Sequence, residues 1–281
     1  QLVVAFPGAT GYGAQSKGGR GGAVIYVTNL DDTGTGSLRA ALEASGPRTV
    51  VFRVSGTIGL DSTIKVTNPY ITIAGQTAPG GGIAVKHSGA SGYDQALLSI
   101  NTHDVILRHI RLRRGPGMMD ESNGDNLSLQ NASNIIIDHT SFSWSTDELM
   151  DGWPANKVTI QWSIFSEALK NANSSAQNNS LGPVFGQQSK ELTVYRNLFV
   201  NNIGRNPKFS PTDGGNFQFV NNLIHNACYG MVFSTLDSPK VAKLNAVGNK
   251  VQLGPHSCND SRQNFILEGN GKRSVYVRDN I

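Results

Sequence analysis

Three segments of one form decide the fold of this chain: Ile135-Ile-Ile-Asp-His-Thr-Ser-Phe142, Val158-Thr-Ile-Gln-Trp-Ser-Ile-Phe165 and Leu192-Thr-Val-Tyr-Arg-Asn-Leu-Phe199. Each opens with apolar residues at alternate positions, as a half-buried strand does, and then turns into a second apolar pair. Further strand segments begin near Val50, Ile71, Val105, Phe217, Leu244 and Val275. The spacing between starts varies, and a fixed unit with loops of variable length is typical of a solenoid.

One polar position repeats in the later units, five residues after the start of each. It is occupied by Asn197, Asn222, Asn249 and Asn280. Asn accepts turn conformations, and its side chain can hydrogen-bond to a copy of itself in the next unit. An internal ladder of this kind indicates parallel coils. Because the segments between the strands lack helical periodicity, we predict an all-β fold, a right-handed parallel β-helix.

The one short helix that the sequence predicts runs from Ser37 to Gly46, with Ser37 as N-cap and Gly46 as the C-terminal stop. An amphipathic helix there would cover the open end of the strand stack. We therefore expect a single β-helix domain over 1–281, with an N-terminal cap at about 1–48. No polar cap follows the last coil, so we expect either a longer natural chain beyond Ile281 or a partner over that end.

Composition restricts the class of partner. A net charge of +4 suits an acidic ligand but is milder than the dense basic face of a nucleic-acid-binding protein. No apolar run approaches the roughly 20 residues of a membrane span. The chain begins at Gln1 without an apolar leader, which fits a processed secreted protein or a trimmed chain. Cys228 and Cys258, the only cysteines, form either one disulfide or two thiols.

Chemistry-bearing residues recur at similar distances from the segment starts. Asp147 and Lys170 lie twelve residues after Ile135 and Val158, and Arg205 lies thirteen after Leu192. If the coils stack about 4.8 Å apart, these three side chains form one column of roughly 10 Å. Such a column predicts a site that holds an anionic polymer, although the two cations could instead form salt bridges with nearby acids.

Acidic residues gather beside this column. Asp125 and Asp147 occupy nearly matched places in adjacent coils, and Asp151 follows four residues after Asp147. Carboxylates this close repel one another unless a cation intervenes, and Ca²⁺ prefers such oxygen ligands. We predict a Ca²⁺ site with Asn123 as a further ligand. The alternative interpretation is a set of solvated loop acids.

Two other groups are given structural roles. The basic run Arg108, Arg111, Arg113 and Arg114 is interpreted as ion pairing and solvated surface. Trp162 is expected to pack in the core, although tryptophans near the predicted cleft are also candidate sugar platforms.

These motifs together resemble those of the calcium-dependent pectate lyases, polysaccharide lyase family 1. Asn134-Ile-Ile-Ile-Asp-His-Thr-Ser-Phe142 is similar to a strand motif of that family, Asp125, Asp147 and Asp151 match its acidic calcium ligands, and Asn123 falls where some members have another acid. Lys170 matches a substrate-contacting lysine, and Gly204-Arg-Asn-Pro207 matches the motif of the proposed base. One departure is Ser210, where the family often has a second arginine, a role that Lys208 would partly fill.

The resemblance implies β-elimination on polygalacturonate or pectin, with Arg205 as base and Lys170 and Lys208 as substrate contacts. It also implies Ca²⁺ as cofactor and a secreted enzyme. From the charge and the apolar runs we expect no nucleic-acid or membrane partner, and we expect a monomer. Two alternatives stay open. One is a non-catalytic glycan-binding β-helix of adhesin or tail type, and the other is a lyase that acts on partly methylated pectin.

Overall fold

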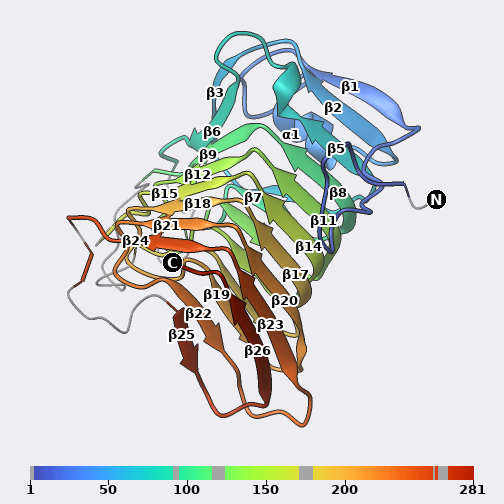
Figure 1. The fold of residues 1–281 in the computed structure, drawn as a ribbon. Helices are drawn as coiled ribbons and strands as arrows, with labels where there is room; N and C mark the ends of the chain where they lie inside the picture. The colour runs from blue at the N-terminus through green and yellow to red at the C-terminus, as the bar shows by residue number, and fades with distance from the viewer. Residues whose placement is uncertain (1–2, 91–94, 116–123, 171–179, 256, 259–264) are drawn as a thin grey trace.

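The computed structural model describes residues 3–90, 95–115, 124–170, 180–255, 257–258 and 265–281. The chain winds as a right-handed parallel β-helix, and from Arg48 to Glu268 every turn visits three sheets (Figure 1). All strand pairs are parallel, so the predicted fold class is confirmed.

The first sheet has 10 strands and carries the segments quoted above. It consists of β1 (Ala23–Val27), β2 (Arg48–Phe52), β5 (Ile71–Ala74), β8 (His103–Arg108), β11 (Ala132–Asp138), β14 (Ala155–Gln161), β17 (Lys190–Tyr195), β20 (Gly215–Val220), β23 (Ala242–Val247) and β26 (Arg273–Arg278).

The second sheet has 8 strands and carries the candidate site. It consists of β4 (Ile64–Val66), β7 (Leu98–Ile100), β10 (Leu127–Leu129), β13 (Asp151–Gly152), β16 (Val184–Gln187), β19 (Lys208–Pro211), β22 (Met231–Ser234) and β25 (Phe265–Glu268).

The third sheet also has 8 strands. It consists of β3 (Gly56–Leu60), β6 (Ile83–His87), β9 (Ile110–Arg113), β12 (Ser141–Ser143), β15 (Ile164–Ser166), β18 (Leu198–Val200), β21 (Leu223–His225) and β24 (Lys250–Gln252).

Eight of the nine predicted starts share one row of register across the first sheet, namely Ile71, Val105, Ile135, Val158, Leu192, Phe217, Leu244 and Val275. The ninth, Val50, is displaced, because Arg48 is the residue that pairs with Ile71. The Arg48 guanidinium points inward and donates to the carbonyls of Ala41 and Leu42. It thereby satisfies free carbonyls at the end of the helix, which favour a positive charge.

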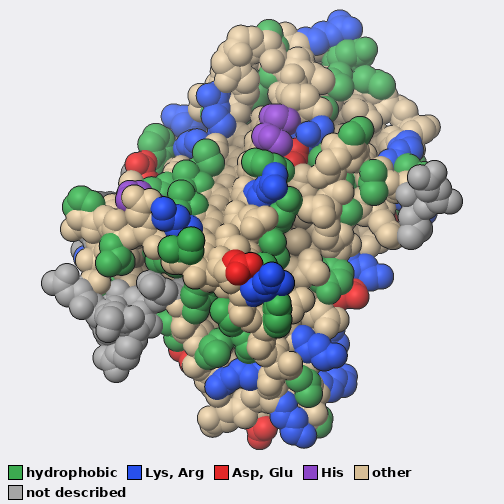
Figure 2. Space-filling view, viewed as in Figure 1, with side chains coloured by type: hydrophobic (Ala, Val, Ile, Leu, Met, Phe, Trp, Pro, Cys, Tyr) green, Lys and Arg blue, Asp and Glu red, His purple; other side chains and the backbone are tan. Residues whose placement is uncertain are grey.

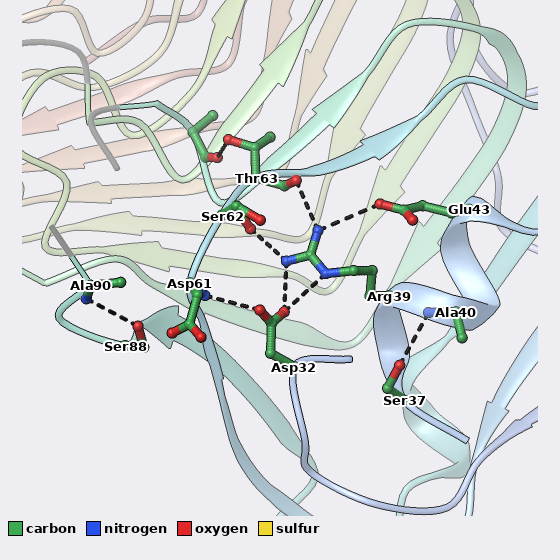
Figure 3. A network of polar contacts seen from close by, with 11 residues as sticks. Asp32, Ser37, Arg39, Ala40, Glu43, Asp61, Ser62, Thr63, Ser88 and Ala90 are labelled. Atoms are coloured by element: carbon green, nitrogen blue, oxygen red, sulfur yellow. Dashed lines mark hydrogen bonds and ion pairs between the residues drawn. The ribbon is translucent and has the colours of Figure 1, made fainter. Parts of the chain in front are cut away.

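That helix is α1 (Leu38–Glu43), which lies at the N-terminal end of the stack (Figure 1). Ser37 accepts from the Ala40 amide as its N-cap, as predicted, but the helix ends at Glu43 rather than running to Gly46. Its buried stripe covers the end of the core. Arg39 anchors it by donating to Asp32 and to the carbonyls of Ser62 and Thr63 (Figure 3).

The interior is filled by columns of like side chains. Phe142, Phe165 and Phe199 stack with ring centroids 4.6 and 5.2 Å apart, and all three are fully buried. Burial of a phenylalanine side chain stabilises the fold by about 1.5–3 kcal/mol. At the turn after the first sheet, the side-chain amide of Asn197 donates a hydrogen bond to that of Asn222, which in turn donates to that of Asn249. The predicted asparagine ladder is therefore confirmed.

The glycine-rich lead-in lies across the outer face of the first sheet. The Gly13 amide donates to Thr159 Oγ1 at 2.9 Å, and the Gly19 amide donates to Thr72 Oγ1 at 3.0 Å. A Cβ at either glycine would clash with a backbone carbonyl of the sheet, which explains the absence of side chains there. The segment therefore packs closely against the sheet as turn-rich structure.

Cys228 and Cys258 form a disulfide, which settles the alternative that the sequence left open. In the described part of the chain, no helix has the length and apolar character needed to cross a membrane.

Candidate functional site

The three predicted metal-binding acids come together on the second sheet. Asp125 precedes β10, Asp147 follows β12, and Asp151 begins β13. The Gly124 carbonyl accepts from the Asp147 amide at 3.4 Å, which places the loops of adjacent coils side by side. Asp125 and Asp151 are 26 residues apart in sequence, but the strand that follows Asp125 pairs with the strand that begins at Asp151, so parallel coiling brings them into neighbouring coils.

A fourth acid, Glu148, joins them. Its amide donates to Asp125 Oδ1 at 2.8 Å, and carboxylate oxygens of Asp125, Asp147 and Glu148 lie within 4.8 Å of one another. We call Asp125, Asp147, Glu148 and Asp151 the acid cluster. Sequence reasoning missed Glu148 because it selected acids at matched spacing. Its one signal was its position beside Asp147.

Burial raises the pKa values of the three aspartates in the acid cluster. The pKa of Asp125 lies well above its usual range because of burial, with the charges of Asp151 and Asp147 adding to the shift. Burial also raises the pKa of Asp147, and it raises that of Asp151 from 3.8 to about 6. The charged forms of these three aspartates are therefore destabilised in the absence of a nearby cation.

The donor set fits a calcium ion. Asp151 Oδ1 is buried and has no hydrogen-bond partner among the described residues, which is costly unless a ligand fills the place. The acid cluster offers carboxylate oxygens close to one another, the ligand type that Ca²⁺ prefers. Asn123, the predicted additional ligand, lies outside the described residues.

Arg205, the predicted base, borders the acid cluster. Its Nη1 forms an ion pair with Glu148 Oε1, and a third of its side chain is exposed. Burial lowers the pKa of Arg205, while the charges of Asp147 and Asp125 oppose that shift. The guanidinium is thus partly desolvated and lies within electrostatic reach of three carboxylates.

The predicted single column of Asp147, Lys170 and Arg205 is only partly realised. The Leu169 amide bonds to the Ser145 carbonyl, so the backbone at Lys170 runs beside that at Asp147. The residue that bridges Glu148 and Gly204, however, is Leu181, not Lys170. The coil that begins at Val158 contains more residues than the coil that begins at Ile135, so equal spacing in sequence does not give equal register.

The two predicted lysine contacts differ from the acids in their surroundings. Lys170 is exposed and has no ion pair within the described parts of the chain. Lys208 lies on β19, in the register row Asp151, Val184 and Lys208 of the second sheet. Its Nζ contacts Glu268 Oε1 at 3.1 Å, so a substrate would have to replace that partner.

A cavity of about 430 Å³ opens over the acid cluster. All four acids line it, together with the polar side chains of Ser99, Ser128 and Gln130 and the indole of Trp153. The mixture of hydroxyl, amide and aromatic groups beside carboxylates suits a polar ligand with several oxygens.

Trp162 does not pack in the core, contrary to the prediction. Its side chain is 43% exposed, and it stacks between the His139 imidazole and the Arg196 guanidinium. The three residues occupy equivalent turns in successive coils and all have positive φ, which points their side chains outward. The basic run is also only partly paired: Arg108 binds Asp138, but Arg111 has no ion pair among the described residues.

The fold and the site define a class: a parallel β-helix with a carboxylate cluster that lines a cavity and an arginine that is ion-paired to one of these acids. Comparison with known proteins narrows this class. Probable pectate lyase C of Aspergillus fumigatus is 37% identical over 279 residues, which is 99% of this chain and 60% of that protein. The protein of the same name from Emericella nidulans is 40% identical over 225 residues, covering 80% of this chain and 48% of its own length.

Solved structures agree on the fold. The cedar pollen allergen jun a 1 superposes with a TM-score of 0.58 at 19% identity, covering 96% of this chain and 82% of its own. A Bacillus pectate lyase in complex with trigalacturonate gives a TM-score of 0.59 at 18% identity, covering 98% and 87%. No protein-family model matches the sequence.

This chain is homologous to the pectate lyases over nearly its whole length, and the resemblance read from its motifs is confirmed. It spans about 60% of the length of the Aspergillus fumigatus relative.

Proposed function

We propose that this chain is a pectate lyase that cleaves 1,4-linked galacturonan by calcium-assisted β-elimination, with Arg205 as the base. The observation that carries the proposal is the ion pair of a partly desolvated arginine with Glu148, a member of the acid cluster that lines an open cavity. Relatives named probable pectate lyase C support the reaction class. A binding-only solenoid has no need of a base beside a metal site.

The acid cluster would hold the cation. Asp125, Asp147 and Asp151 are the proposed ligands, and Glu148 is positioned to add a fourth carboxylate. When bound, Ca²⁺ supplies positive charge that stabilises the negative charge developing on the substrate carboxylate. The raised pKa values of Asp125 and Asp151 support this assignment, because a bound cation would stabilise their charged forms.

Arg205 would remove the C5 proton of the uronate. In the elimination the C5–H bond breaks, and its electron pair forms the C4–C5 double bond as the C4–O bond breaks. The leaving oxygen takes a proton from solvent, and the proton from C5 resides on the guanidine. The base must first be neutral, which is unusual for arginine. Burial of Arg205 favours that state.

Lys170 and Lys208 would bind substrate carboxylates. In the register row of the second sheet, Lys208 lies two strands from Asp151, which corresponds to roughly 10 Å along the cleft. An anionic sugar would compete with Glu268 for Lys208. Lys170, already exposed, would hold the carboxylate next to the reacting carbon.

The wider context belongs to the same proposal. The disulfide between Cys228 and Cys258 is typical of oxidising compartments and supports a secreted protein. We also propose one continuous domain and a monomer. A single cooperative unfolding transition and a monomeric mass in solution would support both, whereas two separate transitions or a dimer would contradict them.

The test follows the ultraviolet absorbance of the unsaturated product during incubation with polygalacturonate, with calcium and with a chelator. We expect a calcium-dependent increase that Arg205→Ala abolishes. Highly methylated pectin should be a poorer substrate, since it lacks free carboxylates. If the parent and Arg205→Ala both bind the polymer without forming product, the chain is a glycan-binding β-helix instead.

A further inference from the structure

A second groove lies on the outer face of the third sheet. It has a volume of about 780 Å³ and is lined by Lys86, Arg113, Trp144 and neighbouring backbone. None of its lining residues also lines the cavity over the acid cluster. Figure 2 shows Lys and Arg side chains gathered over the N-terminal strands of this sheet. We call the lining residues Lys86, Arg113 and Trp144, together with Arg111 on the same face of β9, the basic groove.

Strand pairing places the cations together. Val85 on β6 pairs with Leu112 on β9, so the next residue on each strand, Lys86 and Arg113, lie side by side. Neighbouring strands lie about 4.8 Å apart. Arg111 precedes Arg113 by two residues and therefore points to the same face of the sheet. Three cations thus lie within two strands.

The positive charge is not balanced within the described parts of the chain. Lys86 and Arg111 are exposed and have no ion pair there, although Arg108 in the same basic run is paired. Burial and the nearby Arg111 charge lower the pKa of Arg113, and Glu167 is the one acid that opposes the shift. An anion in the groove would relieve this repulsion.

Two of the side chains are held in place. The Arg113 guanidinium donates to the carbonyl and hydroxyl of Ser141, both at 2.8 Å. The Trp144 indole donates to Glu167 Oε2 at 3.3 Å, and 45% of its side chain remains exposed. An exposed aromatic ring fixed beside cations combines an apolar surface for a sugar ring with positive charge for its carboxylate.

We propose that the basic groove binds a segment of an anionic galacturonan chain, away from the cleft in which the chain is cleaved. The inference rests on the proposed function, because it assigns the same polymer to both sites. Uronate rings along a linear chain recur on the scale of the strand spacing, so successive carboxylates can meet Lys86 and Arg113. Nucleic acid is the less suitable occupant, because it requires a denser basic face.

The test replaces the two exposed cations in the variant Lys86→Glu/Arg111→Glu, since neither holds a contact on which the fold depends. Affinity for polygalacturonate is measured in chelator, where no turnover is expected. We expect the variant to bind at least about tenfold more weakly, with a smaller loss of affinity on adding salt. The matched control is Lys243→Glu/Lys272→Glu, two exposed lysines elsewhere with the same change in charge.

A cleavage assay distinguishes the role of the basic groove from that of the cleft. The groove variant should cleave trigalacturonate at the parent rate, because a trimer occupies the cleft alone, but should lose rate on dilute polymer. Polymer binding equal to that of the control variant would overturn the inference. So would tighter binding of single-stranded DNA than of polygalacturonate. If the parent produces no unsaturated product yet binds polymer through Lys86 and Arg111, the proposed function fails and the groove stands.

Discussion

Glu148 forms an ion pair with Arg205, and through its own amide it also binds Asp125. The proposed base is therefore tied to the proposed metal ligands by one acid. The contact has a chemical consequence, because an adjacent carboxylate favours the charged form of arginine. Deprotonation of Arg205 requires that this carboxylate be neutralised or drawn away.

Glu148→Gln is predicted to shift the pH–rate profile toward lower pH, by about one pH unit. The substitution keeps the size of the side chain but removes the charge that stabilises protonated Arg205. The profile should be measured at saturating calcium, since Glu148 also borders the metal site. Glu191→Gln on β17, remote from the cleft, is the control. A profile that coincides with that of the parent would show that the ion pair does not govern the base.

The parent enzyme is predicted to be most active at alkaline pH. Burial lowers the pKa of Arg205, but Asp147 and Asp125 oppose the shift, so the neutral base becomes more abundant as pH rises. Arg205→Lys should lower kcat by about 10²–10⁴-fold, the usual contribution of a positioned base. Initial rates on polygalacturonate across pH give both results. An optimum below neutral pH would count against Arg205.

The calcium-free protein is predicted to lose stability as pH rises. The pKa of Asp151 is raised from 3.8 to about 6, so the folded state binds the proton more tightly than the unfolded state. Stability from this group is present below pH 4 and is lost as pH rises toward 6, by about 3 kcal/mol. Calcium at 100 times its Kd should restore about 2.7 kcal/mol at neutral pH.

Chemical denaturation at several pH values, with and without chelator, measures this effect. Asp151→Asn should flatten the pH dependence and weaken the response to calcium, whereas Asp61→Asn, an exposed acid, should change neither. A parent protein whose stability increases between pH 4 and 6 in chelator would contradict the assignment.

Phe165→Ala is predicted to destabilise the fold by about 3–5 kcal/mol. The side chain is fully buried between Phe142 and Phe199, so its removal opens a cavity in the interior column. Trp162→Ala, three residues earlier, should cost less than about 1 kcal/mol, because the indole stacks on the surface. Thermal unfolding of the two variants side by side tests the assignment, and equal losses would refute it.

The sequence by itself determined the coil. The alternating residues of eight strand starts and the ladder through Asn197, Asn222 and Asn249 follow from a strand and a tight turn of constant length. Both are local properties, so counting along the chain predicts their register. The acids Asp125, Asp147 and Asp151 could be placed together for the same reason, since few residues intervene between their coils.

Only the tertiary structure decided what depends on longer or variable connections. Leu181 rather than Lys170 lies between Glu148 and Gly204, because the coil that begins at Val158 is longer in sequence than the coil before it. Arg48 displaces the expected strand start because its charge meets the carbonyls of α1. The ion pair of Glu148 with Arg205 joins residues 57 apart in sequence. Such contacts depend on how whole coils stack, which no local pattern records.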